Sequence, residues 1–205
     1  MKNKPKITIC MPGKQFSNIW LKVRDSMIMR MITEGYSVML KYAYDPNIFI
    51  ARNKCAQNID KSCDYVLWLD SDVLASFEVF ERLSAYDKDI VAAPYLMQNL
   101  KQSVVVKGLM WDTDHVLEYF TKEEVEKNAG LQQVEYVGFG FTLIKADVFR
   151  KLQYPWFIQT IVQKDDKRLV LGDDQSFCHQ AKYGGGYKIY CDLSTKVLHL
   201  KEFPI

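Results

Sequence analysis

The chain has 205 residues, and its hydrophobic fraction of 48% and aromatic fraction of 13% are ample for the core of one domain or a compact pair of subdomains. Lys and Arg (27) nearly balance Asp and Glu (25), and the net charge of +2 gives no support to duplex DNA or an anionic membrane as a partner. No segment is apolar for long enough to span a bilayer, and the N-terminus lacks a secretory pattern.

The first half of the chain alternates strand-like and helical patterns. Residues 6–11, 37–44, 64–70 and 90–93 are apolar runs that predict strands. Between them, helices are expected to begin at Ser17 and Ser76, and a short helix is expected to carry Ala51, Cys55 and Ile59 on one face, with Arg52 and Asn53 near its start. This alternation predicts a doubly wound, mostly parallel sheet flanked by helices.

The second half of the chain has a different pattern. Residues 103–109 alternate like a strand of a smaller antiparallel unit, and Thr121 with Glu124 predicts a capping box for a short helix. The charge run over residues 163–168 predicts a solvated loop. Further strands are expected over 142–145, 187–191 and 196–200, and helices over 146–152 and from about 175 to the glycines at 184–186. We expect a single domain over 1–205, with a nucleotide-binding half (1–97) and an acceptor and catalytic half (98–205).

The five cysteines are odd in number and contain no Cys-x-x-Cys pair. Cys10, Cys55, Cys178 and Cys191 fall within apolar segments, which predicts small buried residues with free thiols. Free thiols fit a reducing, cytoplasmic compartment, which is the host cytoplasm if the protein is viral. A catalytic cysteine is the alternative.

The clearest functional pattern is Asp70-Ser71-Asp72, directly after the apolar run of residues 65–69. Ligands of parallel sheets bind beyond the carboxyl ends of the strands. Paired carboxylates there suit a hard divalent cation, which in turn holds phosphate oxygens. The alternative is a polar turn that caps the helix beginning near Ser76.

Two further groups of polar residues lie near the C-terminus. Asp173 and Asp174 precede a helical pattern, so that one carboxylate can cap the helix while the other faces the crevice; simple capping is the alternative. His199 lies in a short apolar strand, where it is either a satisfied core residue or a partner for carboxylates around Mn²⁺. His115 and His179 are interpreted as surface residues.

The chain resembles, over nearly its whole length, the GT-A-fold, nucleotide-sugar-dependent glycosyltransferases of the family 2 type, and small phage- and virus-encoded members look most similar. The resemblance rests on ordered motifs: the first strand into Met11-Pro12-Gly13, Arg52-Asn53, Asp70-Ser71-Asp72, Gly138-Phe139-Gly140, Asp173-Asp174 and the terminal strand with His199. It implies a Rossmann-like mixed, mostly parallel central sheet with a small antiparallel acceptor-side unit.

The resemblance also implies roles for individual residues. It assigns Asp70, Asp72 and His199 to the metal, with Asp70 also near the nucleotide ribose, and Asp174 to the general base, with Asp173 beside it. The implied donor-binding residues are Met11, Pro12, Asp45, Arg52, Asp70, Ser71, Asp72 and Gly140. Gly138–Phe141 either lets the backbone approach the sugar or forms a tight bend. Trp156 and Phe157 either stack on an acceptor sugar or belong to the core.

The implied function is the transfer of a sugar from a nucleotide-diphosphate sugar, with UDP favoured, to a hydroxyl of a glycan or glycoprotein. Mn²⁺ (or Mg²⁺) and inversion by single displacement are expected, and nucleic acid is not expected as a partner. Two departures from the family stand out: Asp173-Asp174 replaces Glu-Asp, and Tyr44-Asp45 replaces a pair of acidic residues. A sugar nucleotidyltransferase and a non-catalytic nucleotide-sugar-binding module remain alternatives, and the chain is either a minimal enzyme or one domain of a longer protein.

Overall fold

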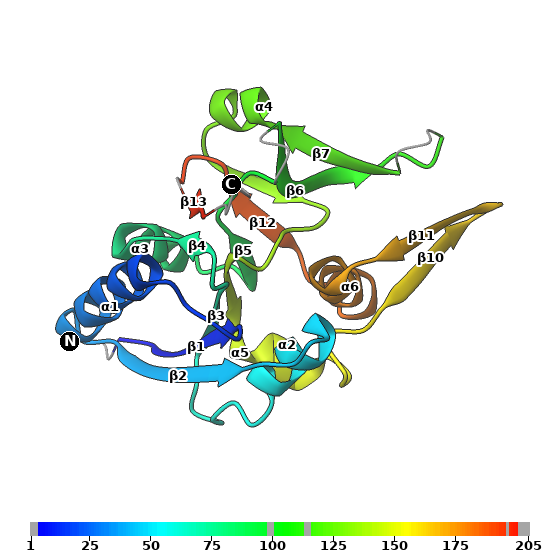
Figure 1. Cartoon of the computed structure of the whole chain (residues 1–205). Coiled ribbons are helices and arrows are strands. Elements are labelled where there is room, and N and C mark those ends of the chain that lie inside the picture. Colours follow the sequence, from blue (N-terminus) through cyan, green and yellow to red (C-terminus); the bar gives the residue numbers. More distant parts are fainter. Residues whose placement is uncertain (1–3, 98–100, 113–115, 196, 201–205) are drawn as a thin grey trace.

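The computed structural model describes residues 4–97, 101–112, 116–195 and 197–200, and its centre is a seven-stranded sheet (Figure 1). The strands follow the order β2-β1-β3-β9-β5-β12-β8, and β9 and β8 run opposite to the other strands. This is the mixed, mostly parallel sheet that the sequence predicts. The strands are β1 (Lys6–Pro12), β2 (Ser37–Ala43), β3 (Tyr65–Leu69), β5 (Ile90–Ala92), β8 (Leu131–Val134), β9 (Phe141–Lys145) and β12 (Ile189–Asp192).

Helices cover both faces of this sheet, and alternate residues of β3 belong to the two cores. Leu67 and Leu69 join a cluster with α1 (Asn18–Thr33) and α3 (Phe77–Ala85). Val66 and Trp68 join the other cluster, with α2 (Ile48–Ala56), α5 (Ala146–Lys151) and α6 (Asp173–His179), which a π-helical turn over Gln180–Gly184 follows. The central apolar run is therefore buried on both faces, as expected of a strand within a doubly wound sheet.

Three small antiparallel pairs flank the central sheet. The strands β6 (Gln102–Leu109) and β7 (Leu117–Thr121) pair beside α4 (Lys122–Lys127), whose capping box between Thr121 and Glu124 is confirmed. The strands β10 (Thr160–Lys164) and β11 (Lys167–Leu171) form a hairpin that projects from the body (Figure 1). The short strands β13 (Leu198–His199) and β4 (Val73–Leu74) form the third pair.

The structure corrects two local predictions. Residues 163–168 are part of the β10–β11 hairpin rather than a loop, because β-branched residues flank the charges and Asp165 adopts a positive φ of 52° at the turn. The second helix is also shifted: Asn47 caps it by accepting from the Phe49 amide, and it ends before Ile59, so that Arg52 lies in its middle rather than near its start.

All five cysteines are buried free thiols, which confirms the prediction for four of them and adds Cys63. Burial raises the pKa of the Cys10, Cys178 and Cys191 thiols, and a hydrogen bond with Cys10 lowers that of Cys55, which is only 1% exposed. Buried thiols of this kind are inert, and the structure gives no support to a catalytic cysteine. Within the described ranges, none of the helices has the length and apolar character needed to cross a membrane.

Candidate active site

The loop with Asp70, Ser71 and Asp72 connects β3 to β4, at the carboxyl end of the central strand. Backbone contacts hold its first residue: the Asp70 amide donates to the Gly140 carbonyl (3.1 Å), and the Asp70 carbonyl accepts from the Val73 amide (3.2 Å). Trp20 Nε1 from α1 also donates to this carbonyl (2.8 Å). The two carboxylates therefore extend from a loop that these hydrogen bonds hold at the carboxyl end of β3, where the sequence predicts them.

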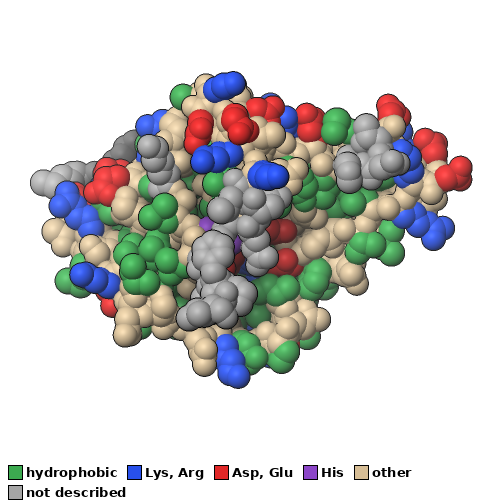
Figure 2. All heavy atoms as spheres, turned by 45° about the horizontal axis from the view of Figure 1, so that its top comes forward, with side chains coloured by type: hydrophobic (Ala, Val, Ile, Leu, Met, Phe, Trp, Pro, Cys, Tyr) green, Lys and Arg blue, Asp and Glu red, His purple; other side chains and the backbone are tan. Residues whose placement is uncertain are grey.

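His199 reaches this loop because β13 pairs with β4, which opposes His199 to Val73. The Leu200 amide donates to the Asp72 carbonyl (2.6 Å), and His199 Nε2 lies 2.9 Å from Asp72 Oδ2. His199 Nδ1 lies 3.0 Å from the Leu96 carbonyl oxygen. In the space-filling view of Figure 2, histidine and acidic side chains lie close together in a hollow of this face.

The partners of His199 make the pair suitable for a cation. A carbonyl and a carboxylate both only accept hydrogen bonds, so a neutral imidazole, which has one N–H, can donate to just one of them. With Nδ1–H donating to Leu96, the Nε2 lone pair points at the Asp72 carboxylate, and either a proton or a cation has to lie between them. Metal-binding histidines commonly donate their other N–H to a backbone carbonyl in this way.

The protein alone supplies few ligands at this point. Among the residues that the structure describes, no group of three or more His, Cys, Asp or Glu side chains is arranged to hold a metal ion. Asp72 is 52% exposed and His199 17%, so that the pair faces solvent, while Asp70 is turned to another partner. A cation on Asp72 and His199 would complete its coordination with water or with oxygens of a bound ligand.

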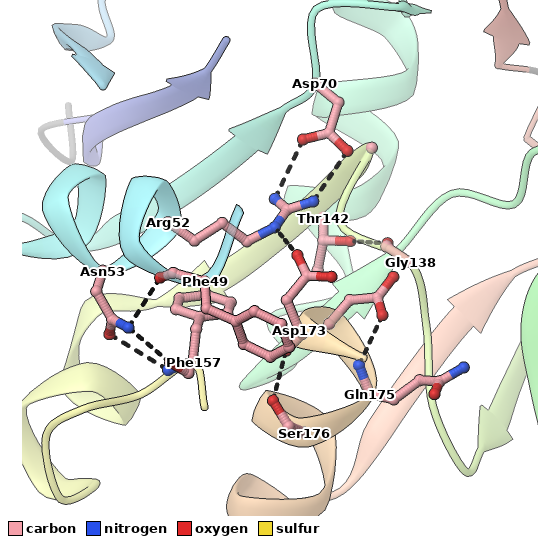
Figure 3. Close-up of polar contacts among 12 residues, drawn as sticks. Phe49, Arg52, Asn53, Asp70, Gly138, Thr142, Phe157, Asp173, Gln175 and Ser176 are labelled. Carbon is pink, nitrogen blue, oxygen red and sulfur yellow. Dashed lines mark hydrogen bonds and ion pairs between the residues drawn. The ribbon is translucent and has the colours of Figure 1, made fainter. Parts of the chain in front are cut away.

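The partner of Asp70 is Arg52 of α2 (Figure 3). Nη1 and Nη2 donate to the two oxygens of Asp70, at 3.1 Å each, and Nε donates to Asp173 Oδ2 of α6. The guanidinium also lies 5.5 Å from the ring centre of Trp68 and 5.4 Å from that of Phe139. Arg52 is 5% exposed, and its guanidinium ties two acidic segments together.

Asp173 and Asp174 occupy the first turn of α6, and Gly172 rather than either aspartate is the N-cap. Asp173 is paired with Arg52, whereas Asp174 accepts from the Gln175 amide (2.7 Å). Burial raises the pKa of the Asp174 carboxyl to about 7; the charge of Asp173 adds to the rise and Arg52 opposes it. A carboxyl that titrates near neutral pH is suited to accept and return a proton.

A cavity of about 300 Å³ lies beside Asp70, Ser71 and Asp72, within the size range of small-molecule sites. Two residues predicted to bind the donor also line it, Pro12 at the end of β1 and Asp45 after β2, together with Tyr44. Asp45 is held by Lys54 (2.9 Å) and the Asn47 amide (3.0 Å), and these bonds lower its pKa. The remaining lining residues are Gly13, Lys14, Pro46, Ile48 and Ala51.

Met11 and Gly140, which the resemblance assigns to donor binding, do not line this cavity. Met11 is fully buried in the core between the sheet and α1. A Cβ on Gly140 would lie 2.6 Å from the ring of Tyr95, and one on Gly138 would lie 2.6 Å from its hydroxyl. The Gly140 amide donates to this hydroxyl (3.1 Å), so the glycines make room for Tyr95.

The sequence does not indicate Tyr95, whose ring centroid lies 5.2 Å from that of His199. It also does not indicate the role of Asn53, which accepts from the amides of Trp156 (3.0 Å) and Phe157 (3.3 Å) and fixes this segment against α2 (Figure 3). Phe157 is 1% exposed, and Trp156 Nε1 donates to the Phe149 carbonyl (2.9 Å). Phe157 therefore belongs to the core, and Trp156 is partly buried against it.

His179 takes no part in this site. His179 is not a surface residue: it is partly buried, its Nδ1 lies 3.0 Å from the Tyr136 hydroxyl, and burial lowers its pKa. No local pattern indicates this contact, because Tyr136 lies outside the helix that carries His179. His115 lies outside the described residues.

No family model and no curated protein sequence matches this chain. Solved structures do match. Protein A197 from STIV is 20% identical with a TM-score of 0.60, covering 97% of this chain and 87% of that chain. The catalytic domain of Drosophila β1,4-galactosyltransferase 7, in complex with xylobiose, is 12% identical with a TM-score of 0.55, covering 97% and 72%. The chain thus has the GT-A-like fold found in glycosyltransferases, as its resemblance to the family 2 type implied.

Proposed function

We propose that the protein is a metal-dependent glycosyltransferase that moves a sugar from a nucleotide-diphosphate sugar to a hydroxyl of a glycan or glycoprotein, with inversion of the anomeric centre. The observation that carries the proposal is the pairing of Asp72 with His199 beside the cavity at the carboxyl end of β3. The GT-A-like fold supports it.

The residues for a divalent cation are Asp72 and His199, and their carboxylate and imidazole fit Mn²⁺ better than Mg²⁺. A cation there would neutralise the negative charge that develops on the leaving diphosphate. Asp70 contributes its charge to the same edge of the cavity, although its carboxylate binds Arg52. Ser71, Pro12 and Asp45 line the space for the nucleoside, and UDP is the donor nucleotide that we expect.

Asp174 is the group that we assign to proton transfer. Its partly buried carboxyl is in equilibrium between its two protonation states near neutral pH. The deprotonated form accepts the proton of the acceptor hydroxyl as that oxygen attacks the anomeric carbon from the side opposite the diphosphate. One displacement of this kind gives an inverted product.

The direct test is a screen of UDP-, GDP- and dTDP-sugars with Mn²⁺, followed by thermal shift and by product analysis. We expect one donor class to raise the melting temperature in the presence of Mn²⁺ and to release a free nucleoside diphosphate. Binding of no donor under these conditions would contradict the proposal. Donor binding without hydrolysis or transfer would favour the non-catalytic binding module instead.

The second candidate, a sugar nucleotidyltransferase, would use the same carboxylates. Such enzymes usually carry a glycine-rich basic loop after the first strand, whereas the segment 11–16 has one glycine, Gly13, and one lysine, Lys14. Both line the cavity. The released product separates the two candidates, since nucleotidyl transfer yields pyrophosphate and glycosyl transfer yields nucleoside diphosphate.

A further inference from the structure

Two adjacent carboxylates, Asp173 and Asp174, begin α6, and the structure gives them different surroundings. Asp173 is 18% exposed and its Oδ2 accepts from Arg52 Nε. The Asp174 carboxylate accepts from the Gln175 amide on its own helix (2.7 Å). Among the described residues, Asp173 is thus tied to another element of the fold, whereas Asp174 is bonded within α6.

Arg52 makes this distinction because its guanidinium uses separate edges for separate carboxylates. The Nη1–Nη2 edge binds Asp70 in a bidentate manner, and Nε binds Asp173 (Figure 3). Trp68 and Phe139 pack near the guanidinium, and the side chain is 6% exposed. A lysine could not reproduce this planar arrangement, because its ammonium is a point charge on a flexible stem.

We propose that Arg52 is a positioning residue that anchors Asp173 and Asp70 together, so that Asp173 holds the start of α6 in place and Asp174 alone serves as the base. The role of Asp174 as the base rests on the proposed transferase function, whereas the anchor by Arg52 is a property of the fold. It reassigns two residues, since Arg52 leaves the donor-binding set and Asp173 leaves the catalytic pair.

Charged and titratable groups from several elements surround Asp174. The charges with the largest effect are those of Asp173 on the same helix, which raises the pKa of Asp174, and of Arg52 on α2, which lowers it. Asp70 at the end of β3 also raises the pKa. Further described groups near Asp174 are the hydroxyls of Tyr119 on β7 and of Tyr95 after β5, and the thiol of Cys178 on α6; they are neutral near pH 7, and burial raises their pKa values further.

The two members of the anchor therefore affect Asp174 in opposite directions. Replacing Arg52 by Gln removes a positive charge and should raise the titration midpoint of Asp174 by about one pH unit or more. Replacing Asp173 by Asn removes a negative charge and should lower this midpoint from about 7. The loss of a charge alone is enough to produce these signs, so Arg52→Lys, which keeps the charge and loses the bidentate geometry, is the variant that isolates the anchor.

The experiment follows the side-chain carboxyl resonances of ¹³C-labelled aspartate through a pH titration of the full chain. The Asp174 resonance is identified by its loss in Asp174→Asn. The variants are Arg52→Gln, Arg52→Lys and Asp173→Asn, and the control is Arg30→Gln, which removes an exposed guanidinium paired with Glu34 on α1. The Arg30→Gln spectrum should show the wild-type midpoint.

Arg52→Lys keeps the charge and should move the midpoint less than Arg52→Gln does, while the loss of the bidentate anchor should reduce transfer on the order of 10²-fold. If Arg52→Gln does not fold, Arg52→Lys carries the test of Arg52, and wild-type transfer by Arg52→Lys would overturn the anchor. An unchanged midpoint in Asp173→Asn, or shifts of the same sign in both variants, would overturn the anchor. Because the titration needs no turnover, a protein without transferase activity would refute the proposed function and leave this result intact.

Discussion

His199 Nε2 lies 2.9 Å from Asp72 Oδ2, although the two residues are 127 positions apart in the sequence. The contact depends on a short antiparallel pair, β13 with β4, that lays the end of the described chain along the residues after Asp72. The other ring nitrogen of His199 lies 3.0 Å from the Leu96 carbonyl oxygen, so a neutral imidazole that donates to this oxygen presents its lone pair to the Asp72 carboxylate. The proposed metal site depends on this geometry.

Asp174→Asn tests the base. The amide has nearly the same shape but cannot accept the proton of the acceptor hydroxyl, so we expect transfer to fall about 10²–10⁴-fold. Donor and Mn²⁺ affinity should stay close to wild type, because Asp174 lies outside the cavity lined by Asp70, Ser71 and Asp72. Initial rates together with calorimetric binding of the donor check both parts. Transfer at the wild-type rate would remove Asp174 from this role.

The raised pKa of Asp174 predicts the pH dependence of the reaction. With a pKa of about 7, the carboxyl is the required base only above neutral pH, so kcat/KM should rise through pH 7 and level off above it. The rate profile of Asp173→Asn should be displaced to lower pH. A profile with no rise between pH 6 and about 8 would be inconsistent with Asp174 as the titrating base.

The same group predicts a cost in stability. A folded-state pKa above the unfolded value near 3.8 means that protonated Asp174 stabilises the fold below about pH 4, and that this contribution is lost as the pH rises through about 7. Asp174→Asn, which stays neutral, should therefore melt a few degrees above wild type at pH 8. The difference should shrink toward pH 4, and thermal unfolding across this range measures it. An equal difference at both pH values would mean that the carboxyl is not perturbed.

Gly140→Ala tests the packing around Tyr95. The new methyl group would meet the Tyr95 ring at 2.6 Å and Val73 at 2.7 Å, so the fold should lose about 1–3 kcal/mol, the usual cost of overpacking. Mn²⁺ affinity should also weaken, because Tyr95 packs against His199 and Val73 is the strand partner of His199. Gly130→Ala provides a comparison, since its φ of 104° strains the backbone but its added Cβ meets nothing within 4 Å. Loss of stability without any change in Mn²⁺ binding would separate Tyr95 from the site.

Local patterns in the sequence predict the framework of this site but not its internal contacts. The strand before Asp70 is recognisable because its apolar run is continuous, and Asp174 is placed correctly at the start of a helix. The pairing of Arg52 with Asp173 joins residues 121 positions apart and has no local signal. His199 was linked to Asp72 only through the resemblance to a family, since nothing near residue 199 indicates its partner.

The wrong or untested assignments have similar physical causes. The side chain of Met11 on β1 belongs to the buried cluster between the sheet and α1. Its position next to Pro12 in the sequence does not indicate this. The charges at 163–168 concealed a hairpin because the β-forming residues lie on either side of them. The sequence interpretation of Gly140 is that its backbone approaches a ligand, whereas in the structure the ring of Tyr95 occupies the space that a Gly140 side chain would take.

The most direct test of the central claim is calorimetric titration of Mn²⁺, with and without UDP, into wild type, Asp72→Ala and His199→Ala. Asp166→Asn in the exposed β10–β11 turn is the control. We predict that UDP strengthens Mn²⁺ binding by wild type and the control, because the protein supplies only part of the coordination, and that binding falls at least about tenfold in each alanine variant. Undiminished Mn²⁺ binding by both alanine variants would contradict the account.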